Sequence, residues 1–255
     1  MENTKVMIGC PTLGLGADPS KWLMSLIITI QDLRRAGIDM SFCFPYRKKI
    51  HDADNQIVQT AMMSKCTHIL RMDDDIWGVH NGDILKLLDA DKEFISAVMY
   101  IRGFPYSRCA FNKTDKSKTL QEIEALGGSH VVEVDGMGIQ PCDLTATPYT
   151  LWKVSLFEKL FYPFFNPNDK GSPDTVFCQK CLDNGIQPYT HLDIQLNHQD
   201  VTPWNRLFLF NAEARRMLSN RMLDPTCEMY KVLAAEFGFD GEKDLYTLKG
   251  VVNHE

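Results

Sequence analysis

The first 75 residues alternate between short apolar runs and stretches with helical spacing, and this alternation limits the possible folds more than any other feature. Apolar runs over residues 5–10, 38–44 and 67–72 have the length and composition of buried β-strands. The stretches between them, 22–35 and 54–64, place apolar residues at helical intervals. A strand–helix–strand–helix–strand order favours a parallel sheet covered by helices, so we expect an α/β fold.

The rest of the chain is less regular but continues the α/β pattern. We expect strands over 94–100, 130–135 and 142–147 and helices over 83–88, 151–161 and 175–184. The polar segment 112–129 is expected to be a surface excursion, and further helical stretches cover 204–220 and 225–237. We therefore expect one main domain over residues 1–200 and a C-terminal helical appendage over 201–255 that packs on the same domain.

Composition excludes several classes of protein. The chain has 255 residues, 24% of them charged, and a net charge of −6, which is typical of a folded domain rather than of a disordered or polyanion-binding chain. Its eight cysteines are spread out instead of clustering at disulfide spacing, so we expect them to be reduced. No apolar stretch has the length of a membrane span or the pattern of a secretory signal. These features predict a cytoplasmic protein.

Three adjacent carboxylates, Asp73, Asp74 and Asp75, directly follow the apolar run 67–72. In an open α/β sheet, ligands bind at the carboxyl ends of the strands, which is where these side chains are expected to lie. Alternate residues of an extended backbone point to the same side, so Asp73 and Asp75 could serve a hard divalent cation and a sugar hydroxyl together. A solvated acidic turn is the simpler alternative.

Short motifs occur in a fixed order along most of the first 200 residues. They are Gly-Cys-Pro-Thr at 9–12, Asp-Asn-Gln-Ile-Val-Gln-Thr-Ala at 54–61, the aspartates at 73–75, the segment 91–102, Val-Asp-Gly-Met-Gly at 134–138, the segments 157–160, 163–165 and 173–178, and Asn-His at 197–198. Together this set resembles the GT-A-fold nucleotide-sugar glycosyltransferases, in particular compact family-2-like members from bacterial and phage genomes. The resemblance implies a Rossmann-like mixed sheet flanked by helices, with residues 1–200 as the catalytic domain.

The resemblance implies roles for particular residues on the donor side. Asp73 and Asp75 belong to the Asp-x-Asp element that reaches the donor ribose and a Mn²⁺ or Mg²⁺ ion, with Asp75 on the metal. His198 is at the position of the histidine that often completes this metal site. The donor is expected to be a nucleotide-diphosphate sugar, most simply a UDP-sugar. The expected donor-binding residues are Pro11, Thr12, Asn55, Asp73 and Asp74.

The chemistry of sugar transfer also needs a group that accepts a proton. The departing diphosphate carries negative charge that a divalent cation stabilises, while the acceptor hydroxyl must lose a proton. Asp174 matches the acid that acts as general base in inverting members of the family. Because Asp174 follows Ser172-Pro173, which is helix-start chemistry, capping of a helix is the alternative role.

Two departures from the family pattern keep other functions open. Many relatives carry Arg where this chain has Asp54, and Arg71 or the basic run 47–49 are candidates to replace it. Many also carry an acidic residue where Pro173 stands. The alternatives are therefore a catalytically degenerate GT-A-like nucleotide-binding protein and a metal-dependent phosphoryl or nucleotidyl transferase.

The sequence leaves the acceptor open. A glycan, a protein and a hydroxylated pyrimidine in phage DNA, for example hydroxymethylated, are all compatible with it, and a phage-encoded protein would act in the host cytoplasm. Basic residues such as Arg215 and Arg216 could contact phosphates of a nucleic acid acceptor.

Overall fold

The structure is a computed structural model that describes residues 4–12, 19–100 and 108–198. The chain divides into two units, Met1–Thr202 and Pro203–Glu255, and the second lies outside the described residues. The helical appendage expected over 201–255, with Arg215 and Arg216, therefore stays a prediction. Within the described ranges, no helix is both long enough and apolar enough to cross a membrane.

The strand–helix alternation expected for the first 75 residues is confirmed. Its elements are β1 (Lys5–Gly9), α1 (Pro19–Arg35), β2 (Asp39–Cys43), α2 (Ile50–Met63) and β3 (His68–Met72). Strand β1 lies between β2 and β3 and pairs in parallel with both. The carboxyl ends of these three strands consequently meet at one edge of the sheet.

The central sheet continues with strands from later in the chain. These are β4 (Ile76–Trp77), β5 (Phe94–Met99), β8 (Ile139–Pro141), β10 (Tyr149–Lys153) and β11 (Tyr189–His198), with α3 (Asp83–Asp89) between β4 and β5. The strand order is β2-β1-β3-β10-β5-β11-β4, and β8 pairs with β11. Because β10 runs antiparallel to both of its neighbours, the sheet is mixed, as the fold class predicts.

A second, smaller sheet and three further helical segments complete the described part of the chain. The sheet has the order β7-β6-β9, made of β6 (Ala110–Lys113), β7 (Val131–Glu133) and β9 (Leu144–Thr145). The helical segments are α4 (Leu120–Ala125), the 3₁₀ segment η1 (Val154–Lys159) and α5 (Pro173–Asp183). Helix α4 begins with a capping box between Thr119 and Glu122, so the polar segment 112–129 contains regular structure that we did not expect.

The helix expected over 151–161 is wrong, because the chain there forms the end of β10 and then η1. Tyr149, Thr150, Leu151 and Trp152 are all buried, since β10 lies between two strands and is covered on both faces. A strand buried on both faces has no alternation of apolar and polar residues, so periodicity alone does not separate it from a buried helix.

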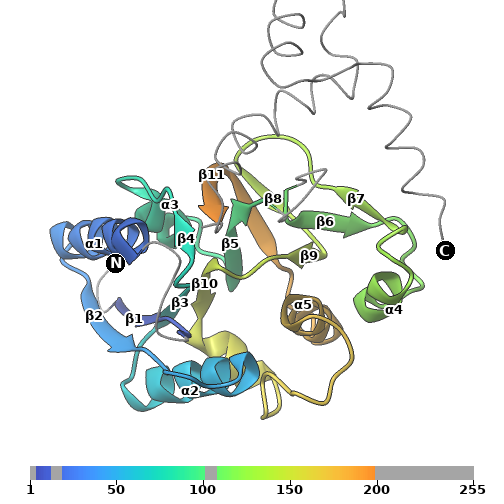
Figure 1. Cartoon of the computed structure of the whole chain (residues 1–255), viewed down its shortest axis with the longest axis horizontal. Helices are drawn as coiled ribbons and strands as arrows, with labels where there is room; N and C mark the ends of the chain where they lie inside the picture. Colours follow the sequence, from blue (N-terminus) through green and yellow to red (C-terminus); the bar gives the residue numbers. More distant parts are fainter. Residues whose placement is uncertain (1–3, 13–18, 101–107, 199–255) are drawn as a thin grey trace, which may run out of the picture. The chain divides into compact units, whose positions relative to one another are not determined.

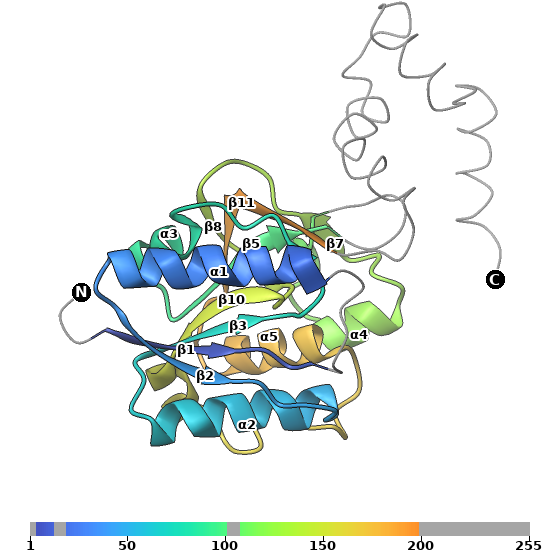
Figure 2. The same cartoon turned by 60° about the vertical axis from the view of Figure 1, so that its left-hand side comes forward.

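Helices cover both faces of the central sheet (Figures 1 and 2). Alternate residues of each strand enter different cores, as the period of a β-strand requires: Ile8 joins the core under α1 and α3, whereas Met7 joins the core with α2, η1 and α5. The second core is rich in aromatic rings packed around Trp152, including Phe165 and Phe177, whose ring centroids are 4.5 Å apart. These two layers hold the strand ends that carry the candidate site.

Candidate active site

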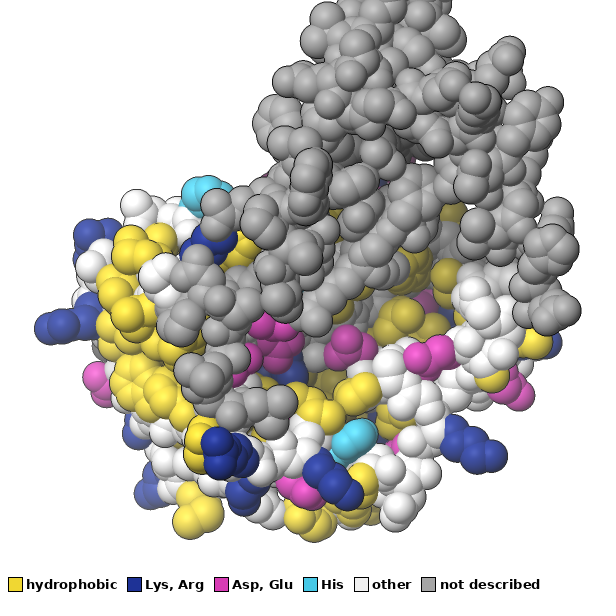
Figure 3. Space-filling view, viewed as in Figure 1, with side chains coloured by type: hydrophobic (Ala, Val, Ile, Leu, Met, Phe, Trp, Pro, Cys, Tyr) yellow, Lys and Arg dark blue, Asp and Glu magenta, His cyan; other side chains and the backbone are white. Residues whose placement is uncertain are grey.

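The ends of β1 and β3 bring together residues that are 62 positions apart in the sequence. Thr12, just after β1, donates a hydrogen bond from Oγ1 to Oδ2 of Asp74 at 2.5 Å. The backbone N–H of Asp73 donates to the carbonyl oxygen of Pro148, which fixes the start of the acidic segment to the residue before β10. Figure 3 shows acidic side chains gathered near the middle of the face seen in Figure 1. Thr12 and Asp74, both expected to bind the donor, are therefore in contact, and their binding of a donor stays a prediction.

A buried ion-pair network stands directly behind Asp73. Nη1 of Arg71, on β3, lies 2.7 Å from Oδ1 of Asp73, and Nε of Arg71 donates to Oδ1 of Asp54 on α2 at 3.1 Å. Arg71 and Asp54 are 4% and 2% exposed. Burial raises the pKa of Asp54 to about 6, against the opposing attraction of Arg71. The side chain of Asp73 is 27% exposed, so it is the solvent-facing member of a network whose other two side chains are buried.

Pairing of β4 with β11 places His198 beside the chain segment that follows Asp75. The antiparallel register of β4 with β11 sets His198 opposite Ile76, the residue that follows Asp75. Trp77 donates from its indole N–H to the backbone carbonyl oxygen of His198 at 3.3 Å, which strengthens this short pairing. His198 therefore lies opposite the residue that follows Asp75, although the two residues expected to bind a metal are far apart in sequence.

The donor set at this point fits Mn²⁺ or Mg²⁺ in part. Nδ1 of His198 lies 3.3 Å from the carbonyl oxygen of Tyr100 and, since a carbonyl can only accept, this contact places a proton on Nδ1. A backbone carbonyl that orients the ring in this way is common behind metal-binding imidazoles. Among the described residues, no group of three or more His, Cys, Asp or Glu side chains could hold a metal ion. An ion on Asp75 and His198 would thus need further oxygen ligands from a bound diphosphate or water.

Asp174 is in the first turn of α5 but does not cap this helix. Ser172 is the N-cap and accepts from the backbone N–H of Thr175 at 3.3 Å. The carboxylate of Asp174 instead accepts a hydrogen bond from Oγ1 of Thr147 at 2.5 Å. Burial raises the pKa of Asp174, and the hydrogen bond from Thr147 offsets this only in part. The carboxylate is therefore a stronger base than one on an open surface.

Asn55 and Pro11 lie deeper than donor-contacting residues usually do. The amide of Asn55 donates to the carbonyl oxygen of Phe165 at 2.6 Å and accepts from the backbone N–H groups of Phe164 and Phe165. These contacts attach the loop after η1 to α2, and Asn55 is buried. Pro11 is buried as well. A donor contact for either residue stays a prediction.

Sequence reasoning missed Thr147, which links two parts of the network. Its carbonyl oxygen accepts from Nη1 of Arg71 at 2.9 Å, while its hydroxyl contacts Asp174. Thr147 is the last residue of the strand expected over 142–147, but β9 ends at Thr145 and Thr147 lies in the connection to β10, where no motif marks it as functional. Arg71, a candidate to replace the arginine that many relatives carry at position 54, is buried in β3 and pairs with Asp54 and Asp73.

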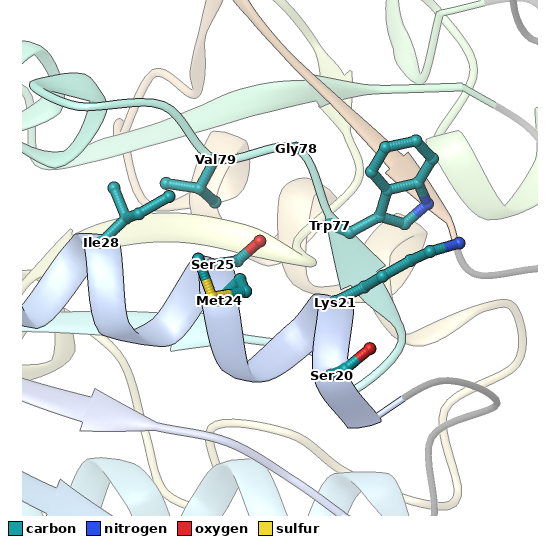
Figure 4. Close-up of a pocket in the computed structure, with 8 residues that line it drawn as sticks. All are labelled: Ser20, Lys21, Met24, Ser25, Ile28, Trp77, Gly78 and Val79. Carbon is teal, nitrogen blue, oxygen red and sulfur yellow. The ribbon is translucent and has the colours of Figure 1, made fainter.

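A pocket of about 220 Å³ lies between α1 and the chain segment that follows Asp75 (Figure 4). Its lining residues are Ser20, Lys21, Met24, Ser25, Ile28, Trp77, Gly78 and Val79. Nζ of Lys21 lies over the ring of Trp77, 4.9 Å from its centroid. The pocket thus combines the indole of Trp77, two residues after Asp75, with the ammonium group of Lys21 on α1.

Comparisons with known proteins find similar solved structures but no similar sequence. No family model matches the chain, and no curated protein matches its sequence. Among solved structures, a protein from STIV is similar with a TM-score of 0.49 and 12% identity over 76% of this chain and 85% of that one. A mutant of Drosophila beta1,4-galactosyltransferase 7 in complex with manganese, UDP-Gal and xylobiose is similar with a TM-score of 0.44 and 12% identity over 80% of this chain and 73% of that one.

GalNAc-T7 with UDP, GalNAc and Mn²⁺ is similar with a TM-score of 0.47 and 10% identity over 76% of this chain, which corresponds to 43% of the length of GalNAc-T7. The matched structures named here thus include two glycosyltransferases with bound UDP-sugar or UDP and manganese. At these identities the similarity concerns the fold alone.

Proposed function

We propose that the protein is a metal-dependent glycosyltransferase that moves a sugar from a nucleotide-diphosphate donor, preferably a UDP-sugar, to an acceptor hydroxyl. The observation that carries this proposal is the meeting of Thr12, the aspartates 73–75 and His198 at one edge of the sheet. A hydroxyl, several carboxylates and an imidazole at the carboxyl ends of the strands suit a ribose, a diphosphate and a divalent ion.

On the donor side, Thr12 and Pro11 would line the base and ribose, and Asp73 and Asp74 would accept hydrogen bonds from ribose hydroxyls. The contact between Thr12 and Asp74 supports this division, because it orders two chain segments that would enclose the same ligand. Asn55 would support this region by holding the loop at Phe164 and Phe165 against α2.

On the metal side, Asp75 and His198 would hold Mn²⁺ or Mg²⁺ together with oxygens of the diphosphate. A divalent ion supplies positive charge where the departing diphosphate gains negative charge. The residues themselves orient this centre: the contact of His198 with Tyr100 fixes the imidazole ring, and the β4–β11 pairing fixes the position of Asp75 relative to it.

On the acceptor side, Asp174 would take the proton from the attacking hydroxyl. Its raised pKa favours proton acceptance, and the hydrogen bond from Thr147 orients the carboxylate. A glycan, a protein and a hydroxylated pyrimidine in DNA remain the acceptor classes. The pocket with Lys21 and Trp77 begins two residues along the chain from Asp75, so it is a place to test for acceptor contacts.

The proposal is tested by incubating the wild-type protein with a panel of UDP-sugars, with and without Mn²⁺, and measuring release of UDP. We expect slow Mn²⁺-dependent hydrolysis without acceptor and faster release when a suitable acceptor is added. If the protein binds UDP with Mn²⁺ but does not cleave the bond between UDP and the sugar, it is a nucleotide-binding protein without transferase activity. Cleavage between the phosphates would instead indicate a phosphoryl or nucleotidyl transferase.

A further inference from the structure

Arg71 is held from three directions by different parts of the chain. Asp54 on α2 contacts Nε, Asp73 after β3 contacts Nη1, and the carbonyl oxygen of Thr147 also contacts Nη1. A guanidinium that is only 4% exposed is costly to bury unless such partners compensate for the lost hydration. The planar fork of arginine makes the direction of each contact specific.

The contact with Asp54 fixes the orientation of the Arg71 guanidinium group. Nε donates its hydrogen bond to Asp54, so Nη1 is directed towards Asp73 and Thr147. Asp54 itself is 2% exposed and lies on a helix below the acidic segment, where a donor would not reach it. Its described contact runs through Arg71, so its effect on the site is indirect.

The same network reaches the candidate base. Thr147 accepts from Arg71 through its carbonyl oxygen and donates to Asp174 through its hydroxyl. Burial lowers the pKa of Arg71, but the nearby carboxylates of Asp54, Asp73 and Asp174 more than offset this and raise it. One guanidinium thus interacts electrostatically with three carboxylates: Asp54 on α2, Asp73 just after β3 and Asp174 on α5.

We propose that Asp54 is a positioning residue, which holds Arg71 so that the donor-side carboxylate Asp73 and the base Asp174 keep a fixed geometry relative to each other. This role rests on the proposed glycosyltransferase function, and it assigns to Asp54 a task in turnover. The Asp54–Arg71 pair would set the distance between the two halves of the reaction centre, much as groups behind metal ligands tune the ligands in front of them.

The test compares Asp54→Asn, which keeps the volume and removes the charge, with Asp54→Glu, which keeps the charge. Asp32→Asn is the matched control, because Asp32, on α1, is also a buried carboxylate. Asp32 accepts a hydrogen bond from the backbone N–H of Gly82 at 2.6 Å. We expect Asp54→Asn to lower kcat about 10–100-fold at saturating donor and acceptor, with a smaller change in KM for the donor. Asp54→Glu should recover part of kcat, and Asp32→Asn should keep it.

Thr147→Val gives a second measurement in case Asp54→Asn folds poorly. Valine has nearly the shape of threonine, so the backbone contact with Arg71 remains while the hydrogen bond to Asp174 is lost. We expect a fall in kcat here as well.

An active wild type together with a kcat for Asp54→Asn within twofold of wild type, or equal to that of Asp32→Asn, would overturn the positioning role alone. A wild type that neither binds UDP with Mn²⁺ nor cleaves a UDP-sugar would overturn the proposed function, and the positioning role with it.

Discussion

At the scale of single residues, Asp54 makes stability depend on pH in an unusual direction for a carboxylate. Its pKa rises from 3.8 to about 6 on folding, because burial outweighs the attraction of Arg71. The folded chain therefore binds this proton more tightly than the unfolded chain does. Its contribution to stability is present below about pH 4 and is lost as the pH rises through 6.

We predict that Asp54→Asn flattens the fall in unfolding free energy between pH 4 and pH 6, since asparagine does not titrate. Urea unfolding at several pH values measures this slope. Asp54→Glu, which keeps an ionisable group, should retain it. An unchanged slope in Asp54→Asn would mean that the proton is held elsewhere in the network.

A second prediction at this scale separates chemistry from helix capping at α5. Because Ser172, not Asp174, caps the helix, Ser172→Ala should cost about 0.5–2 kcal/mol of stability and leave transfer nearly unchanged. Asp174→Asn should keep donor affinity and lower turnover by about two to four orders of magnitude, as loss of a general base does. Thermal melts and single-turnover rates of both variants measure the contrast, and near wild-type transfer by Asp174→Asn would remove it from the mechanism.

At the scale of elements, the packing of α2 on β1 sets the position of Asp54. Gly9 ends β1 with no room for a side chain, because a Cβ there would collide with Cγ2 of Ile57 on α2. Gly9→Ala should therefore push α2 away from the sheet and destabilise the protein by about 1–3 kcal/mol. Equilibrium unfolding measures this cost.

Removing the colliding side chain is the matched control. Ile57→Ala should itself be destabilising, yet the double variant Gly9→Ala/Ile57→Ala should lose less stability than the sum of the single variants. Additive losses would show that the strain of Gly9→Ala lies elsewhere.

The elements also show how far sequence reasoning reaches. The strands β1, β2 and β3 were predicted because each is a separate apolar run bounded by loops, and the place of the aspartates 73–75 followed from where β3 ends. Thr12 was named only because of the resemblance to a known family. The insertion of β10 between β3 and β5 was missed, because long-range pairing leaves no local pattern in a strand buried on both faces. Thr147 was missed for the same reason, since its importance comes from β10 bringing it beside Arg71.

At the scale of the whole molecule, a ligand that binds only the folded protein stabilises all of it. UDP with Mn²⁺ at about 100 times its dissociation constant would add about 2.7 kcal/mol, which corresponds to a rise of roughly 5–11 °C in Tm for a protein of this size. UDP or Mn²⁺ alone should give a smaller rise in Tm, because the diphosphate oxygens are expected to coordinate the ion together with the protein.

The variants decide whether this stabilisation comes through the predicted metal site. Asp75→Asn and His198→Ala should each remove most of the Mn²⁺-dependent part of the shift, because β4–β11 pairing sets His198 opposite the residue after Asp75 and both are proposed to bind the ion. His80→Ala is the matched control, since the side chain of His80 is 80% exposed on the loop before α3. Differential scanning calorimetry measures all four proteins. If Asp75→Asn and His198→Ala keep the full Mn²⁺-dependent shift, the ion binds elsewhere and the pairing of β4 with β11 only shapes the edge of the sheet.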